Sequence, residues 1–331
     1  MIFNEEPFKT LTMEESQIIN FFQATLAPDA AIREPAEASL KSMAKIAGFP
    51  SILLKIITDE QQNAQTKQSA AVHLKNLVVN NYKIEDDEPN KFSIHENDKV
   101  TLRNNIIPAL VTSPDQIRNQ LAVMINTMIK ADYAAGRWRD QLHQTVLEYL
   151  QNENATQHMW LAAFIVLLQL TKVFEYKKDT ERQLLLDAMK IFLPLMLAAS
   201  KKFLHDNTPT CMLLVKYVMK TFYALSQYNL PVDLFSVDSI SEWINVFQQV
   251  LQAAVPADVD EMDEDEKCET PHWKAKKWAL HIIKRLDNNV YIFSKFLSTR
   301  SIEILSIGLS AHISSIILWY LEKFFFMLSV A

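Results

Sequence analysis

Histidine, cysteine and carboxylate side chains, which most often carry out chemistry in proteins, are not spaced in this sequence as catalysis or metal binding requires. The eight histidines show no metal-ligand spacing. Cys268 and His272 lie four positions apart, but Pro271 stands between them and no further ligand is near. No Ser, His and Asp arrangement and no glycine-rich phosphate loop is present. We therefore expect no enzyme, no metal and no cofactor.

The strongest charged feature is the stretch DVDEMDEDEKCE, residues 258–269, which holds eight carboxylates in twelve residues. Because like charges repel, we expect an extended, hydrated loop. It is either only a solvated loop or an electrostatic attractor for a basic partner. The candidate binding residues in it are Asp258, Asp260, Glu261, Asp263, Glu264, Asp265 and Glu266. The net charge of -6 argues against direct nucleic-acid binding.

A second candidate surface lies on the stretch TKQSAAVHLKNLVVNNY, residues 66–82. Wound as an α-helix, it places Ala70, Ala71, Leu74, Leu77 and Val78 along one apolar stripe. Val72 and Val79 form a second ridge on nearly the opposite side, with Lys75 and Asn76 beside it and Asn80 one turn on. A helix with two faces to cover is typical of an inner member of a helical-repeat array.

The whole chain is predicted to be helical, since no run with the two-residue period of a strand occurs. Only three of the 331 residues are glycine, which disfavours phosphate loops and hairpin-rich sheets. Several helix starts carry Pro after a capping residue, as at Thr208-Pro209. Taken in pairs, the helices repeat at about the period of HEAT hairpins. We expect an all-α fold, a HEAT-repeat-like α-α superhelix (solenoid) of antiparallel helix pairs. The helices are expected at 14–27, 29–48, 49–59, 61–82, 95–113, 114–134, 137–152, 155–176, 179–206, 208–228, 231–254 and 271–287.

Two runs resemble the N-terminal signature of the importin-beta (karyopherin-beta) superfamily. In IREPAEASLKSM (32–43) an R-x-x-A-E-x-x-L helix precedes the A-x-x-L-K-N of the helix at 66–82. Four further segments are similar to one subgroup, the Ran-binding importins numbered seven and eight: SPDQIRNQL (113–121), KVFEYKK (172–178), FYALSQYNLP (222–231) and HWKAKKWALHIIKRL (272–286). The resemblance covers about residues 14–286. The turn from Asp132 to Trp138 departs from the subgroup's pattern by one extra residue and a missing proline, so we expect a looser turn.

The resemblance implies a nuclear import receptor that shuttles between cytoplasm and nucleus. It implies that the concave face of the N-terminal repeats binds the GTPase Ran in its GTP form, with Lys75, Asn76 and Asn80 as contacts. The acidic loop would then attract Ran or basic cargo proteins, and grooves between helices would accept Phe-Gly motifs of nuclear-pore proteins. The alternative is that the three polar residues are a solvated face and the chain is a helical-repeat interaction scaffold without transport competence.

The sequence divides into residues 1–100, with the importin-beta-type N-terminal repeats, 101–287, with further HEAT-like repeats and the acidic loop, and an apolar tail, 288–331. The tail does not resemble the family, and a truncated transcript or gene model would explain it. Residues 304–321 contain no Asp, Glu, Lys or Arg, which leaves a membrane anchor as a minority alternative, weakened by His312 and four serines. With two cysteines and no visible secretory signal, we expect a reducing compartment.

Overall fold

The computed structural model describes residues 15–83, 92–227 and 231–288, and every regular element within these ranges is helical. The all-α prediction is therefore confirmed. Two compact units form, residues 1–145 and 146–331. The sequence division at residues 100 and 101 stays a prediction. The apolar tail, including the anchor alternative at 304–321, lies outside the described residues.

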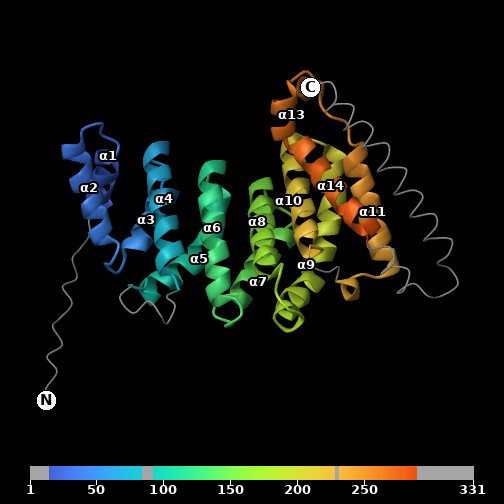
Figure 1. Ribbon diagram of the computed structural model, residues 1–331, viewed down its shortest axis with the longest axis horizontal. Coiled ribbons are helices and arrows are strands. Elements are labelled where there is room, and N and C mark those ends of the chain that lie inside the picture. Colours follow the sequence, from blue (N-terminus) through green and yellow to red (C-terminus); the bar gives the residue numbers. More distant parts are fainter. Residues whose placement is uncertain (1–14, 84–91, 228–230, 289–331) are drawn as a thin grey trace, which may run out of the picture. The chain divides into compact units, whose positions relative to one another are not determined.

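The first unit is an array of antiparallel helices in two layers. Its α4 packs along α3 and α6, while α3 and α6 each contact α5, and α1 contacts α2, α3 and α4 (Figure 1). Asn63 caps the start of α4, where its side chain accepts a hydrogen bond from the Thr66 amide. The helices are α1 (Glu15–Ala24), α2 (Ala30–Met43), α3 (Phe49–Thr58), α4 (Ala64–Asn81), α5 (Glu96–Thr112) and α6 (Asp115–Asp132), and α7 (Arg139–Gln151) crosses the boundary between the units.

The apolar stripe predicted on α4 is the stripe that the fold buries. Ala70, Ala71, Leu74 and Val78 have no exposed surface, and Leu77 is 6% exposed. The small alanine side chains let neighbouring helices approach closely on this side. On the other side Val79 remains 44% exposed. Helix α4 is therefore covered by α1, α3 and α6 on one side and accessible on the other.

The second unit is built around α10, which packs against α8, α9 and α14. Its predicted cap is present: the Thr208 side chain accepts a hydrogen bond from the Cys211 amide, and Pro209 follows it. The aromatic side chains of Phe222, Trp243 and Phe247 meet between α10 and α11. The elements are α8 (Gln157–Phe174), α9 (Asp179–Asp206), α10 (Pro209–Leu225), the 3-10 helix η1 (Val232–Leu234), α11 (Val237–Gln252), α12 (Ala257–Asp260), α13 (Glu264–Glu269) and α14 (Pro271–Asn288).

Among the described residues, two helices have the length and composition to span a membrane, α8 and residues Thr180–Asp206 of α9. Buried positions make up 67% of the apolar window of α8 and 50% of that of α9. A buried core helix of a helical protein has the same length and apolar composition as a membrane-spanning helix. Consistent with this burial, α8 packs against α9 and α10.

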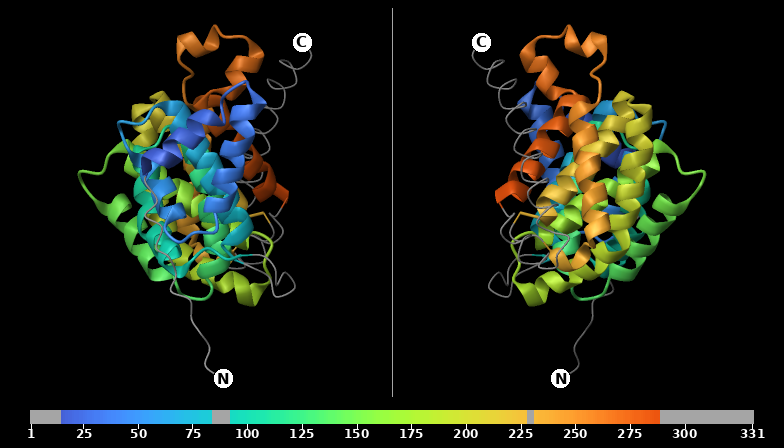
Figure 2. Two further views of the ribbon diagram at one scale, coloured as in Figure 1. Left: turned by 90° about the vertical axis from the view of Figure 1, so that its left-hand side faces the viewer. Right: turned by 90° about the vertical axis from the view of Figure 1, so that its right-hand side faces the viewer.

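The acidic loop was expected to be extended, and this expectation is wrong. Residues 257–260 and 264–269 form the short helices α12 and α13, which project beyond the end of α14 (Figures 1 and 2). Asp263 caps α13 by accepting a hydrogen bond from the Glu266 amide at 2.9 Å. Carboxylates in the first turn interact favourably with the positive end of a helix, and Lys267 lies among them. Capping and counter-charge outweigh the mutual repulsion that favours extended chain.

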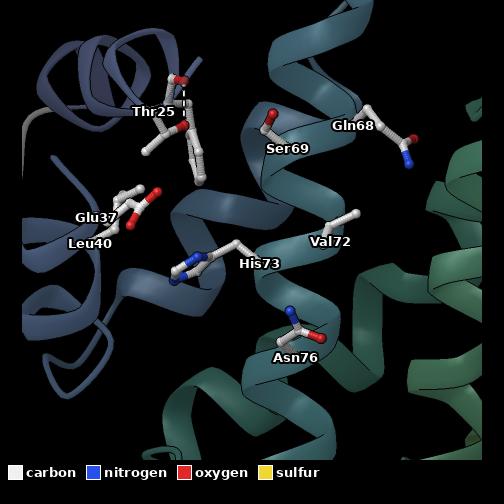
Figure 3. A pocket seen from close by; sticks show the side chains of 9 residues that line it. Thr25, Glu37, Leu40, Gln68, Ser69, Val72, His73 and Asn76 are labelled. Atoms are coloured by element: carbon white, nitrogen blue, oxygen red, sulfur yellow. Dashed lines mark hydrogen bonds between the residues drawn. The ribbon is translucent and has the colours of Figure 1, made fainter. Parts of the chain in front are cut away.

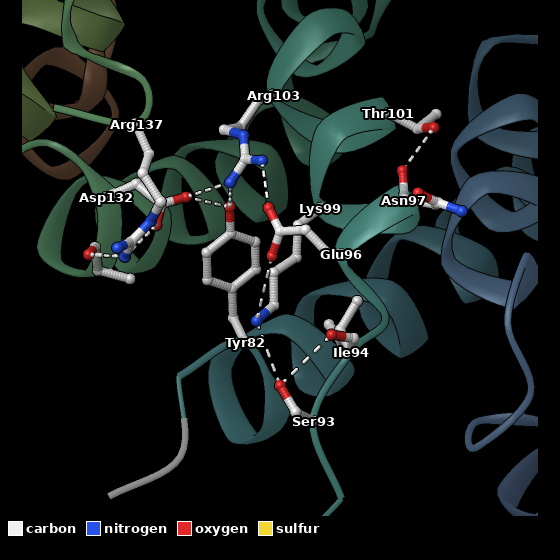
Figure 4. A network of polar contacts seen from close by, with 11 residues as sticks. Tyr82, Ser93, Ile94, Glu96, Asn97, Lys99, Thr101, Arg103, Asp132 and Arg137 are labelled. Atoms are coloured by element: carbon white, nitrogen blue, oxygen red, sulfur yellow. Dashed lines mark hydrogen bonds and ion pairs between the residues drawn. The ribbon is translucent and has the colours of Figure 1, made fainter. Parts of the chain in front are cut away.

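A buried polar network connects α4, α5 and α6 at one end of the first unit (Figure 4). Asp132, 2% exposed, accepts hydrogen bonds from the Tyr82 hydroxyl at 2.5 Å and from Arg103 at 2.8 Å. Arg137 donates to its other oxygen at 2.7 Å, and Glu96 pairs with Arg103. Burial by itself would raise the pKa of Asp132, but these hydrogen bonds hold the pKa below its ordinary value.

The same network closes the turn that departs from the family pattern. The Arg137 amide donates to the Asp132 carbonyl and the Gly136 amide to the Tyr133 carbonyl, both at 3.1 Å. Gly136 adopts the left-handed conformation, with φ 76°, which glycine tolerates without strain. Trp138 is 1% exposed and donates its indole N–H to the Arg103 carbonyl. The turn expected to be looser is thus fixed at both ends.

We predict that Asp132→Asn destabilises the first unit by about 3 kcal/mol, because it leaves the buried guanidinium of Arg103 without its inner partner. Native-state hydrogen exchange of the buried amides of α4 to α6 should then accelerate by about a hundredfold. The control is Asp140→Asn, whose side chain is 91% exposed and lies 3.5 Å from Arg139. Equal exchange in the two variants would contradict a stabilising role of the network.

We also predict that Asp263→Ala shifts the Cα chemical shifts of residues 264–269 toward random-coil values in NMR spectra. The variant removes the cap of a helix that is too short to persist without one. Asp265→Ala is the matched control, because it deletes a carboxylate of the same segment without touching the cap. A helix that survives Asp263→Ala unchanged would show that other contacts hold α13.

Candidate functional site

The three polar residues predicted on α4 lie together on its accessible edge. Asn76 and Asn80 are exposed and Lys75 is half-buried. The Lys75 ammonium donates to the Asn76 carboxamide oxygen at 2.5 Å, which orients both side chains. One cation and two carboxamides can bind carboxylates, carbonyls and backbone amides of a protein partner. The edge has the chemistry of a protein-binding surface.

A pocket of about 340 Å³ adjoins this edge, between α1, α2 and α4 (Figure 3). Asn76 belongs to both the edge and the pocket. The α4 wall also contains Gln68 and Val72, and α2 contributes Glu37 and Leu40. Polar side chains and apolar surface therefore alternate around an opening that a side chain of a partner can enter.

His73 forms the floor of this pocket between two aromatic rings. Its ring centroid lies 5.9 Å from that of Phe22 and 5.8 Å from that of Phe49, in edge-on contacts. Burial lowers the pKa of His73 below its ordinary value, so the imidazole is neutral at pH 7. We assign it a packing role that shapes the pocket.

The pocket was not predicted from the sequence, although the spacing of its α4 residues is visible there. Ser69, Val72, His73 and Asn76 follow the i, i+3, i+4, i+7 spacing that places residues on one helix face. The residues that complete the pocket come from α1 and α2, and nothing in the spacing says that these helices cross that face.

All seven predicted acidic residues are exposed on or beside α12 and α13. Lys267 lies 3.5 Å from Glu264 and 3.9 Å from Asp260, so it offsets part of the charge. Among the described residues, Asp258, Glu261, Asp265 and Glu266 make no ion pair. A concentrated negative field therefore remains at the end of the second unit.

Helix α14 follows the acidic segment directly and carries five basic residues, one of which forms an ion pair with the segment. Lys274 pairs with Glu269 at 2.6 Å, which lowers the pKa of Glu269. Lys276 instead donates to the carbonyls of Leu251 and Ala253 at the end of α11, at 2.5 and 2.7 Å. Burial lowers the pKa of Lys276 to about 8.

Cys268 and His272 are in different environments. The Cys268 side chain is exposed, whereas His272 is buried with Nε2 at 3.2 Å from the Asn207 carbonyl. No group of three or more His, Cys, Asp or Glu among the described residues could hold a metal ion.

Comparison with known proteins agrees with this fold. Residues 36–112 match the family model of the importin-beta N-terminal domain. Importin-8 of Mus musculus is 36% identical over 278 residues, which cover 83% of this chain and 27% of the relative. The chain thus spans about a quarter of the length of the curated relatives it matches. Relatives named importins and exportins are transport receptors rather than enzymes.

Solved structures share the fold at low sequence identity. The exportin Cse1 in its cargo-free, cytoplasmic state has a TM-score of 0.70 and 17% identity, over 86% of this chain and 32% of that one. Kap95 in a Kap95:Nup1 complex has a TM-score of 0.57 and 16% identity, over 89% and 32%. These structures confirm the HEAT-repeat solenoid that the paired helices predicted. The chain belongs to the importin-beta superfamily of nuclear transport receptors and is similar to Importin-8.

Proposed function

We propose that this chain contains the Ran-binding N-terminal part of a nuclear import receptor. The observation that carries the proposal is the accessible edge of α4, where Lys75, Asn76 and Asn80 stand beside a pocket in a segment that matches the importin-beta N-terminal domain. Ran in its GTP form is the proposed partner, and GTP-dependent binding is the expected switch.

The edge suits a protein partner by its size and chemistry. Lys75 supplies a positive charge next to two carboxamides, and the pocket offers Val72 and Leu40 for an apolar side chain. Interfaces commonly combine such an apolar hollow with a polar rim. The edge of α4 supplies the rim, and the space between α1, α2 and α4 supplies the hollow.

The acidic segment is proposed to accelerate the encounter with basic partners. Its exposed carboxylates would attract either a basic surface of Ran or Lys/Arg-rich cargo proteins before close contact forms. Such steering acts over about 30 Å at 0.01 M salt and about 10 Å at 0.1 M.

The wider transport role is also part of the proposal. Phe-Gly motifs of nuclear-pore proteins are proposed to bind between repeat helices, in line with the fold shared with Kap95 in its complex with Nup1. The chain would then shuttle between cytoplasm and nucleus. The alternative is a helical-repeat scaffold without transport competence, since the chain spans about a quarter of the curated relatives. A membrane tether gains no support from these relatives.

We predict that the full chain binds Ran loaded with GTP more tightly than Ran loaded with GDP, and that Lys75→Glu with Asn76→Ala weakens the GTP-form complex at least about tenfold. Titration calorimetry measures both. The matched control is Lys190→Glu with Asn105→Ala, which makes the same chemical changes at exposed positions on other helices. Unchanged affinity of the α4 variant would remove these residues from the interface, and no GTP preference would favour the scaffold.

We further predict that replacing the carboxylates at 260–266 by their amides slows association with Ran in its GTP form, mainly at low salt. Stopped-flow rates at two salt concentrations test this, since screening at high salt should bring the variant and the unaltered chain together. An association rate that responds neither to salt nor to the substitution would rule out steering by this segment.

A further inference from the structure

A cationic and aromatic surface runs across α8, α10 and α14 in the second unit. On α10, Lys216, Lys220 and Tyr223 follow at i, i+4 and i+7, and on α14, Lys277, His281 and Lys284 follow a similar spacing. These helices are neighbours, because α10 packs against both α8 and α14. We call this the cationic-aromatic surface and define it by Lys172, Lys220, Tyr223, Lys277, Trp278 and Arg285.

Ring contacts hold the surface together at its centre. The rings of Tyr223 and Trp278 lie 5.1 Å apart. The Lys220 ammonium lies 5.3 Å from the Trp278 ring centroid, and the Arg285 guanidinium carbon lies 4.7 Å from that of Tyr223. Arg285 also donates to the Tyr223 hydroxyl at 3.2 Å. The rings therefore form a platform on which cations are already positioned.

The positive charges of the surface act on one another. Burial lowers the pKa of Lys220, and the like charges of Lys172, Lys274 and Lys277 lower it further. Burial and the neighbouring Lys277, Lys284 and Arg285 have the same effect on the pKa of His281. An anion placed between these groups would weaken the repulsion between their positive charges.

Within residues 15–83, 92–227 and 231–288, few carboxylates lie near this charge. Glu269 is bonded to Lys274, and Glu175, whose pKa is raised by burial, lies near Lys172 and Arg285. Within the part of the chain that the structure describes, Lys172, Lys220 and Lys277 take part in no ion pair. The surface thus presents lysine ammonium groups beside aromatic ring faces, and Glu175 and Glu269 offset their charge only in part.

We propose that the cationic-aromatic surface binds an acidic peptide segment of a partner protein. Carboxylates of the peptide would pair with the lysines, and its apolar side chains would pack on Tyr223 and Trp278. A protein segment fits better than a nucleic acid, because α13 packs against α14 and its exposed carboxylates would repel a long polyanion. This partner is distinct from the basic partners proposed for the acidic segment.

The test is the binding of a short fluorescein-labelled peptide of alternating glutamate and phenylalanine to the full chain, measured by fluorescence anisotropy at low salt without Ran. We expect saturable binding that weakens with salt, and at least about a tenfold loss of affinity in Lys172→Glu with Lys277→Glu. Both lysines are exposed, so folding should be preserved, as circular dichroism would verify.

The matched control is Lys190→Glu with Lys201→Glu on α9, which imposes the same charge change on the same unit and should leave the affinity within about twofold. A peptide with glutamine in place of glutamate should not bind. Absence of peptide binding, equal losses in both variants, equal binding of the glutamine peptide, or tighter binding of single-stranded poly-uridine RNA would each overturn the proposal.

Discussion

The structure depends on one constraint, that a helix with apolar residues around much of its circumference must be covered by more than one neighbour. In the first unit α4 meets this requirement by packing on α1, α3 and α6, and in the second α10 does so with α8, α9 and α14. A helical pair alone would leave apolar surface in water, so each hairpin needs the next one. The two-layer arrays follow from this need rather than from strong local preferences.

The same constraint decides where function can be located. When neighbours cover most of a helix, only a narrow strip and the connections between helices remain for binding. On α4 the strip carries Lys75, Asn76 and Asn80, and on α10 it carries Lys220 and Tyr223. The acidic segment occupies a connection, between α11 and α14. Binding surfaces of a helical array are therefore short, repeated along the chain and different in charge from one place to the next.

Much of this could be predicted from the sequence, because it depends on neighbours in sequence. The buried stripe of α4 follows from the spacing of Ala70, Ala71, Leu74 and Val78, and the start of α10 follows from Thr208-Pro209. The network around Asp132 could not be predicted, since its partners Tyr82 and Arg103 lie 50 and 29 residues away.

The prediction of an extended acidic segment failed for a different reason. Its like charges do repel, but repulsion competes with hydrogen bonding at the helix end, and one capping residue with one lysine was enough to reverse the outcome. Charge density alone therefore predicts exposure, which the structure confirms, and not local conformation. The pocket beside Asn76 shows the complementary limit: one wall follows from helix spacing, while the other depends on which helices cross it.

The acidic segment and the basic helix that follows it remain separate surfaces in part because two of the five basic groups of α14 are engaged elsewhere. Lys276 and Arg285 donate to carbonyls at the ends of other helices, which satisfies those helix ends and removes both cations from reach of the carboxylates. Among the residues that the structure describes, the bond between Lys274 and Glu269 is the one ion pair between the acidic segment and α14. If all five basic residues of α14 paired with the acidic segment, both fields would cancel and neither could attract a partner. Because Lys276 and Arg285 bond to helix ends and Lys220 lies over a ring face, the second unit presents both a negative and a positive surface, and each would repel a partner whose charge suits the other.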